Sequence, residues 1–165
     1  MILIGLGANL PSKFGGPAAT IGAAVDELAK AGAVATARSR LYRSAPVPAS
    51  DQPWFLNEAI AMKTELTPGN LLALMHRIEA QFGRERRERD GPRTLDLDLL
   101  AYDGCVQAGG EGEPTLPHPR LSQRAFVLRP LAEVAPGWRH PITGETIGHL
   151  IAALPPGQIA EPISD

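Results

Sequence analysis

The sequence predicts an α+β protein with helices packed on a mainly antiparallel sheet. Apolar residues recur at helical spacing in residues 17–31 and 67–83, and extended segments lie around these two stretches. The elements do not follow the regular alternation of strand and helix that a parallel sheet requires, so antiparallel pairing is favoured. At 165 residues, the chain has the length of one domain with a single core.

The composition excludes several classes of protein. A net charge of -2 and a pI of about 6.1 argue against a general nucleic-acid binder, because such domains are usually basic. Cys105 is the single cysteine, so no intramolecular disulfide forms, and the Cys and His residues lack zinc-site spacing. The first residues do not resemble a signal peptide and no apolar run approaches 18 residues. We therefore expect a cytoplasmic protein that does not associate with membranes.

The first elements are expected to be two strands around a helix. Ile2 to Leu6 reads as a buried strand, followed by a tight turn in residues 5–11. This turn lacks the third glycine of a dinucleotide fingerprint. Residues 17–31 are alanine-rich and amphipathic, which predicts a helix, and residues 34–42 alternate loosely, which predicts a strand.

A proline-rich segment separates these elements from the second helix. Residues 44–53 contain three prolines, which predicts an irregular loop and a candidate lid. Residues 54–62 are predicted to form a strand. Thr67 and Pro68 are typical of a helix start and Gly83 of a helix end, so a helix is predicted between them.

Residues 95–99 show the strongest strand pattern in the chain. Leucine and aspartate alternate strictly, so Asp96 and Asp98 share one face of a half-buried strand. A turn at residues 102–105 and a glycine-rich loop follow this strand. The apolar residues of 126–134 predict a helix and a short last helix is predicted to end at Leu154, whereas the tail from about 155 to 165 is expected to be poorly ordered.

Two aspartates next to a run of arginines form the candidate site. Residues i and i+2 of a strand are about 6.5 Å apart, so Asp96 and Asp98 can share a cation, and oxygen ligands favour magnesium over zinc. Five of the sixteen basic residues lie in residues 84–93, and the arginine fork matches phosphate oxygens. These residues indicate a metal and nucleotide site. The alternative, that both aspartates form the solvent face of an edge strand, stays open.

The common phosphate-binding motifs do not occur. The chain has neither the Gly-x4-Gly-Lys-Ser/Thr loop of P-loop proteins nor the His-Arg-Asp loop of protein kinases. A less common class of nucleotide site is therefore expected.

Six short motifs point to such a class by their order and spacing. They are Phe55 to Asn57, Arg77 to Glu79, Gly83 to Arg86, Gly91 to Asp98, Pro117 with His118, and Arg124 to Leu131. Together they resemble the 6-hydroxymethyl-7,8-dihydropterin pyrophosphokinases of folate biosynthesis, and the resemblance runs from Ile4 to about Leu154. It implies a ferredoxin-like α+β fold and a single catalytic domain over residues 1–165. It also implies transfer of the β,γ-pyrophosphoryl group of ATP to the pterin, with release of AMP.

The resemblance further implies roles for individual residues. Two magnesium ions would bind Asp96 and Asp98, which with Arg84 and Arg93 make up the catalytic set. The implied ATP-binding residues are His76, Glu79, Arg84, Arg86, Arg93, Thr115, His118 and Arg124. The implied pterin-binding residues are Ser44, Ala45, Val47, Phe55, Asn57, Asp96 and Phe126. Both substrates are small molecules, so neither a nucleic acid nor a membrane is an expected partner, and we expect a monomer.

Other readings of the same residues stay open. A two-metal nucleotidyltransferase also uses paired aspartates but releases pyrophosphate. A ferredoxin-like RNA-binding module could use the arginine run as a basic patch. Phe55 and Phe126 also suit an apolar core, and His76 also suits an exposed helix surface.

Overall fold

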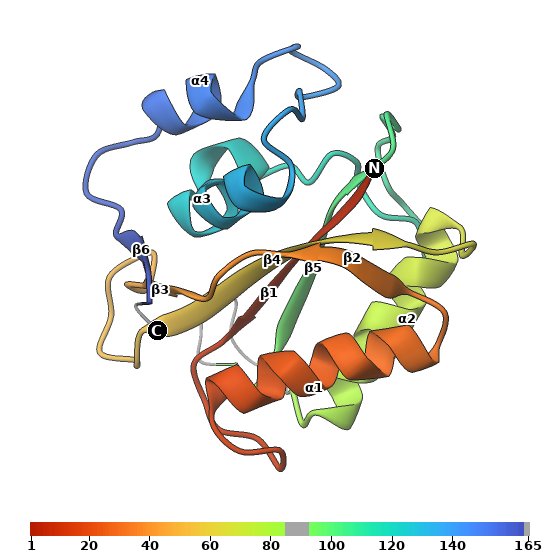
Figure 1. The fold of residues 1–165 in the computed structure, drawn as a ribbon, viewed down its shortest axis with the longest axis vertical. Helices are drawn as coiled ribbons and strands as arrows, with labels where there is room; N and C mark the ends of the chain where they lie inside the picture. Colours follow the sequence, from red (N-terminus) through yellow and green to blue (C-terminus); the bar gives the residue numbers. More distant parts are fainter. Residues whose placement is uncertain (85–92, 164–165) are drawn as a thin grey trace.

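The computed structural model describes residues 1–84 and 93–163. Within these ranges, a six-stranded sheet lies between helices α1 and α2 on one face and α3 on the other, with α4 packed on α3 (Figure 1). The strands are β1 (Ile2–Ala8), β2 (Val34–Arg38), β3 (Tyr42–Ser44), β4 (Phe55–Lys63), β5 (Asp96–Tyr102) and β6 (Ala160–Pro162). The helices are α1 (Pro17–Lys30), α2 (Pro68–Gln81), α3 (Ala125–Val134) and α4 (Ile147–Ala152). The predicted α+β class is confirmed.

All named strand pairs in the described sheet are antiparallel. β1 lies between β4 and β5, β4 also pairs with β2 and β3, and β3 pairs with β6. In this order β5 is an edge strand and β1 is an inner strand. The edge strand therefore carries both aspartates, next to a strand that is buried on both sides.

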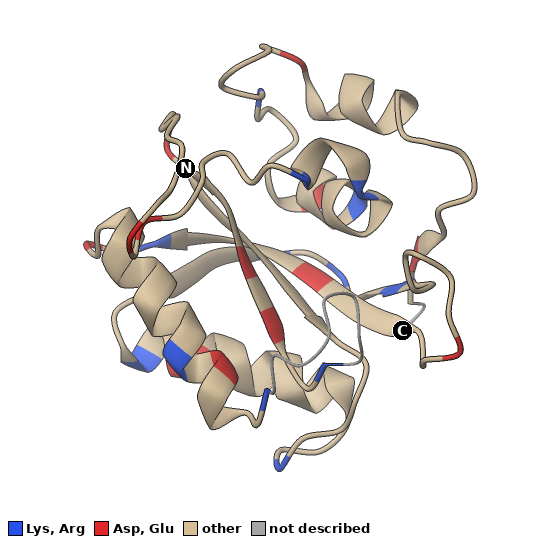
Figure 2. Cartoon of the chain, turned by 180° about the vertical axis from the view of Figure 1, so that it is seen from behind, with Lys and Arg blue, Asp and Glu red and all other residues tan. Residues whose placement is uncertain are grey.

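The side chains around β5 divide between the two faces of the sheet. Leu95, Leu97 and Leu99 are buried in the core between the sheet and helices α1 and α2. Asp96 and Asp98 consequently point to the opposite face, where α3 packs. The predicted strand with its two aspartates on one face is confirmed, and Figure 2 shows these acidic positions of β5 within the sheet.

Local signals place the second helix as predicted. The Thr67 hydroxyl accepts a hydrogen bond from the Asn70 N–H at 3.2 Å, and Pro68 is the first residue of α2. Gly83 has a φ of 80°, a left-handed conformation that glycine adopts without strain. Among the described residues, no helix combines the length and apolar character needed to cross a bilayer.

The prediction of one continuous strand over residues 34–42 was wrong. The structure has two strands, β2 and β3, separated by Ser39 to Leu41. The Ser39 hydroxyl accepts the Ala59 N–H at 2.9 Å and donates to the Arg40 carbonyl at 2.7 Å. Because a side chain takes the place of a backbone partner, the regular ladder stops there.

The predicted tight turn at residues 5–11 was also wrong at its start. β1 continues to Ala8, and Gly7 pairs with Asn57 on one side and Asp96 on the other. The glycines suggested a turn, yet in this strand they serve close packing across an inner position.

The tail is more ordered than predicted. Residues 155–163 are described, and β6 pairs with β3 along Tyr42 to Ser44. The Ile163 N–H also donates to the Leu41 carbonyl at 2.9 Å. The backbone N–H and C=O groups along the edge of β3 bond to the tail, and the sequence of the tail alone does not show that these groups lie nearby.

Candidate active site

Two cavities share the aspartates of β5. The first has a volume of about 320 Å³ and lies between the segment after β3 and the N-terminal end of α3. The second has a volume of about 280 Å³ and is bordered by α2 and residues 114–119. Asp96 and Asp98 line both cavities. The geometry therefore suits two ligands that meet at the two carboxylates.

The inner strand β1 keeps side chains off part of the floor of the first cavity. Gly7 lies opposite both Asn57 and Asp96, and Gly5 lies opposite Asp98. Since neighbouring strands are about 4.8 Å apart, Asn57 and Asp96 are two spacings, about 10 Å, from one another. A Cβ atom on Gly7 would lie 2.9 Å from Asn57 Nδ2. Glycine at this position leaves room for the Asn57 amide and for a ligand.

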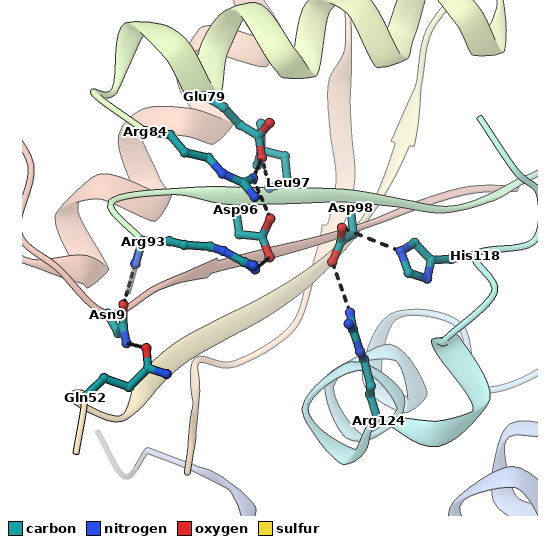
Figure 3. A network of polar contacts seen from close by, with 10 residues as sticks. All are labelled: Asn9, Gln52, Glu79, Arg84, Arg93, Asp96, Leu97, Asp98, His118 and Arg124. Atoms are coloured by element: carbon teal, nitrogen blue, oxygen red, sulfur yellow. Dashed lines mark hydrogen bonds and ion pairs between the residues drawn. The ribbon is translucent and has the colours of Figure 1, made fainter. Parts of the chain in front are cut away.

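Two arginines hold the carboxylate of Asp96. Arg84 Nη1 donates to Asp96 Oδ1 at 2.7 Å and Arg93 Nη1 donates to Oδ2 at 3.0 Å (Figure 3). Arg84 Nη1 also contacts Glu79 Oε2, which accepts the Leu97 N–H at 2.9 Å. Glu79 is only 2% exposed, so it ties the arginine to the base of β5. The charge of Asp96 is thereby balanced by the chain itself.

Asp98 is compensated less well. His118 Nε2 and Arg124 Nη1 each lie 3.7 Å from its carboxylate, beyond hydrogen-bonding distance (Figure 3). Burial and the nearby Asp96 carboxylate raise the pKa of Asp98 to about 7. Burial and the positive charge of Arg124 lower the pKa of His118 to about 4, so this imidazole is neutral at pH 7. An ionised Asp98 therefore attracts an additional cation.

The donor atoms fit magnesium that arrives with a phosphate ligand. Within residues 1–84 and 93–163, no group of three or more His, Cys, Asp or Glu side chains is arranged to hold a metal ion. Magnesium commonly takes one or two protein carboxylates and completes its octahedron with water and substrate phosphates. Asp96 and Asp98 supply this kind of partial set, at the junction of the two cavities.

The residues predicted to bind the pterin come together around the first cavity. Its lining includes Ser44, Ala45, Val47, Phe55, Asn57, Asp96 and Phe126. The buried Ser44 hydroxyl donates to Asn57 Oδ1 at 2.6 Å, which fixes the orientation of the Asn57 amide. Phe55 and Phe126 are partly exposed in the cavity, and Phe126 also packs against the core beneath α3. Both rings therefore border the cavity and are not purely core side chains.

The residues predicted to bind the nucleotide divide between the cavities. Those that line the second cavity are His76, Glu79, Arg84, Thr115 and His118. Arg93 and Arg124 line the first cavity, beside Asp98. Arg86 lies outside the described residues. His76 is exposed on α2, in agreement with the alternative of a surface histidine, yet it borders the second cavity.

Asn9 was missed by the sequence analysis. It is 4% exposed, and its Oδ1 accepts the Arg93 N–H at 2.8 Å. Its Nδ2 donates to Gln52 Oε1 at 2.9 Å (Figure 3). It also donates to the Pro53 carbonyl at 2.9 Å. Asn9 thus joins the arginine that holds Asp96 to the loop that borders the first cavity. The only sequence signal is an amide residue directly after a buried strand, which is weak.

Comparisons with known proteins agree with the predicted chemistry. Residues 3–136 match the family model described as 7,8-dihydro-6-hydroxymethylpterin-pyrophosphokinase. The chain is 46% identical over 157 residues to a 2-amino-4-hydroxy-6-hydroxymethyldihydropteridine pyrophosphokinase of Methylorubrum extorquens, covering 94% of each chain. Proteins with the same name from Synechocystis sp. and Pseudomonas aeruginosa are 41% and 39% identical. These matches cover 90% of this chain and 73% of the first protein, and 93% of this chain and 91% of the second.

Proposed function

Because the chain belongs to the 7,8-dihydro-6-hydroxymethylpterin-pyrophosphokinase family, we propose that its two cavities bind the two substrates of pyrophosphoryl transfer. Membership of this family makes the protein an ATP-dependent diphosphotransferase of folate biosynthesis. ATP enters the second cavity and 6-hydroxymethyl-7,8-dihydropterin enters the first. The β,γ-pyrophosphoryl group passes to the hydroxymethyl oxygen, and AMP leaves. The observation that carries this proposal is that Asp96 and Asp98 line both cavities.

In this proposal, Asp96 and Asp98 would be the protein residues that hold the two magnesium ions. Magnesium, when bound, neutralises charge on the phosphates and orients them for in-line attack on the β-phosphorus. The role of β5 is to present both carboxylates on one face, with Asp98 undercompensated by its neighbours. The backbone ladder to β1 keeps this pair in place during the reaction.

Arg84 and Arg93 exchange one anionic partner for another. In the ligand-free structure both donate to Asp96. With ATP bound, each guanidinium would turn from Asp96 to a phosphate oxygen, which it matches with its planar donors. The arginines then stabilise the negative charge that develops on the leaving AMP phosphate and on the transferred group.

The neutral His118 ring carries its proton on Nε2, the nitrogen that can donate to a ligand. Its Nδ1 accepts the Arg120 N–H at 3.1 Å, so the single proton of the neutral ring is on Nε2. Nε2 points toward Asp98 and the ring lines the second cavity. We infer that His118 donates to a phosphate oxygen and does not act as a base.

The first cavity suits a flat, amide-containing ring. Asn57 offers an amide whose orientation is fixed by Ser44, which suits the donor and acceptor edge of a pterin. Phe55 and Phe126 supply aromatic faces, and Ala45 and Val47 supply apolar contacts. The hydroxymethyl group would then face Asp96 and Asp98 across Gly7 and Gly5.

The substitution Gly7→Ala should weaken pterin binding with little effect on the nucleotide. The new methyl carbon would come within 2.9 Å of Asn57 Nδ2, so the amide must move from its bond with Ser44. We expect the KM for the pterin to rise about tenfold, from the loss of about one well-placed hydrogen bond. Steady-state kinetics with each substrate varied in turn measure this. Gly22→Ala is a control in α1, at a position where a Cβ meets nothing within 4 Å.

The products of the reaction test the proposed function. Purified protein is incubated with magnesium, ATP and 6-hydroxymethyl-7,8-dihydropterin, and the nucleotides and pterins are separated by chromatography. We expect equal amounts of AMP and pterin diphosphate. ADP with a pterin monophosphate, or pyrophosphate with an adenylylated pterin, would contradict the proposal, and the second result would identify a nucleotidyltransferase.

We also propose that the enzyme works as a monomer in the cytoplasm on these small molecules. Side chains of a single chain surround both cavities, from β1 to α3. Figure 2 shows acidic and basic positions interspersed over the described chain. This distribution favours small charged substrates over a nucleic acid or a membrane surface.

A further inference from the structure

The tail of the chain contacts both sides of the first cavity. Ala160 of β6 pairs with Ser44 of β3, and the Ala45 N–H donates to the Ile159 carbonyl at 3.3 Å. On the other side, Gln158 bonds to the segment that begins α3. The tail lies beyond residue 136, where the match to the family model ends. It links the segment after β3 to the segment that begins α3.

Helix α3 begins without a cap of its own. Its N-cap residue is Arg124, whose side chain makes no capping hydrogen bond. Arg124 is turned instead toward Asp98, and its guanidinium lies over the Phe126 ring, 5.3 Å from the centroid. A helix start usually carries Ser, Thr, Asp or Asn, whose oxygen satisfies a free N–H. The N-cap position is therefore occupied by a residue that faces the cavity and does not cap the helix.

Gln158 supplies the missing contacts from 33 residues away. Its Oε1 accepts the Ala125 N–H at 2.8 Å, and its Nε2 donates to the Gln123 carbonyl at 2.7 Å. The two bonds flank Arg124, one on each neighbouring residue. A planar amide that binds both neighbours restricts the backbone torsions of the residue between them.

We propose that Gln158 is a positioning residue that sets Arg124 and Phe126 for pterin binding through these two hydrogen bonds. This inference rests on the proposed function, which places the pterin in the cavity that both side chains line. Gln158 itself is absent from the lining of that cavity. Its effect must therefore pass through the backbone of Gln123 to Ala125.

Kinetics of three variants test the proposal. Gln158→Ala removes both bonds, and Gln158→Glu keeps the acceptor for the Ala125 N–H but loses the donor to Gln123. We expect the KM for the pterin to rise about tenfold in the first variant and about threefold in the second, and the KM for ATP to rise clearly less in each, because Arg124 and Phe126 line the first cavity and not the second. Glu161→Gln is the matched control from the same tail. Its exposed pair with Arg43 contributes little, so both KM values should be unchanged.

Amide hydrogen exchange in the ligand-free protein gives a readout that does not depend on the reaction. In Gln158→Ala, the Ala125 amide should exchange at least about tenfold faster, and the amides of α2 should be unaffected. Unchanged protection of Ala125 would overturn the inference even if the proposed function failed its own test. A lower Tm with an equal rise in both KM values would reduce Gln158 to a general stabilising residue and would also overturn it.

Discussion

Replacing Asp98 with asparagine is expected to lower kcat by about 10³-fold or more while the protein stays folded. The amide keeps the shape of the side chain but removes the negative charge that would bind magnesium in the proposed function, and with it the charge stabilisation at the reacting phosphates. The leucines of the same strand, which fill the core, are untouched. Purified variant and wild type are compared by AMP formation at saturating ATP and magnesium.

The same substitution should stabilise the ligand-free protein above neutral pH. The pKa of Asp98 is about 7 in the folded chain, raised from 3.8 by burial and by Asp96. A raised pKa means that the protonated carboxyl's contribution to stability is complete below about pH 4 and is lost as the pH rises through 7. At pH 8 the folded wild type therefore bears a cost of a few kcal/mol that asparagine avoids.

Thermal unfolding without magnesium checks this result at two pH values. We expect Asp98→Asn to have a higher Tm than wild type at pH 8 and a smaller Tm difference at pH 5, where the carboxyl is protonated in the folded wild type but already ionised in the unfolded chain. Asp103→Asn is a suitable control, since Asp103 lies in the exposed turn after the same strand. It should leave kcat unchanged. Wild-type kcat in Asp98→Asn would contradict the proposed role of this residue in metal binding.

Local patterns were sufficient to predict the main elements and the strand that carries the two aspartates. The leucine and aspartate alternation places both carboxylates on one face of β5, and Thr67 marks the start of α2. Such signals depend on neighbours within a few residues, so they are visible in the sequence. The assignment of individual residues to either substrate came from motifs with recognisable spacing.

Contacts between distant segments could not be predicted in this way. Asn9 bonds to a residue 84 positions later, and Gln158 bonds to residues 33 and 35 positions earlier. Gly7 looked like a turn residue because its role depends on Asn57 and Asp96, its partners on either side in the sheet. In each case the sequence shows a common residue type, and only the fold shows its partner.

The replacement of Asn9 with alanine is expected to weaken the binding of both substrates. Asn9 is bonded to Arg93 on one side and to Gln52 and Pro53 on the other, so one buried amide orders two loops. Its loss leaves the Arg93 N–H without this partner and should lower the free energy of unfolding by about 1–3 kcal/mol. We expect kcat/KM to fall about 100-fold for the pterin and for ATP, because residues 44–53 lose their bonds to the Asn9 amide and Arg93 loses the bond to its N–H, although its carbonyl still accepts the backbone N–H groups of residues 9 and 10.

A variant that removes a contact on only one side of Asn9 separates the coupling of the two loops from a simple loss of stability. Gln52→Ala removes one contact on the loop side and should raise the KM for the pterin only. Pterin affinity is measured by calorimetry with and without a non-hydrolysable ATP analogue and magnesium. If Asn9 couples the two loops, the analogue should strengthen pterin binding in wild type and in Gln52→Ala but much less in Asn9→Ala, since coupling requires an element shared by both sites. Equal enhancement in all three proteins would show that the two cavities communicate by another route, through Asp96 and Asp98 themselves.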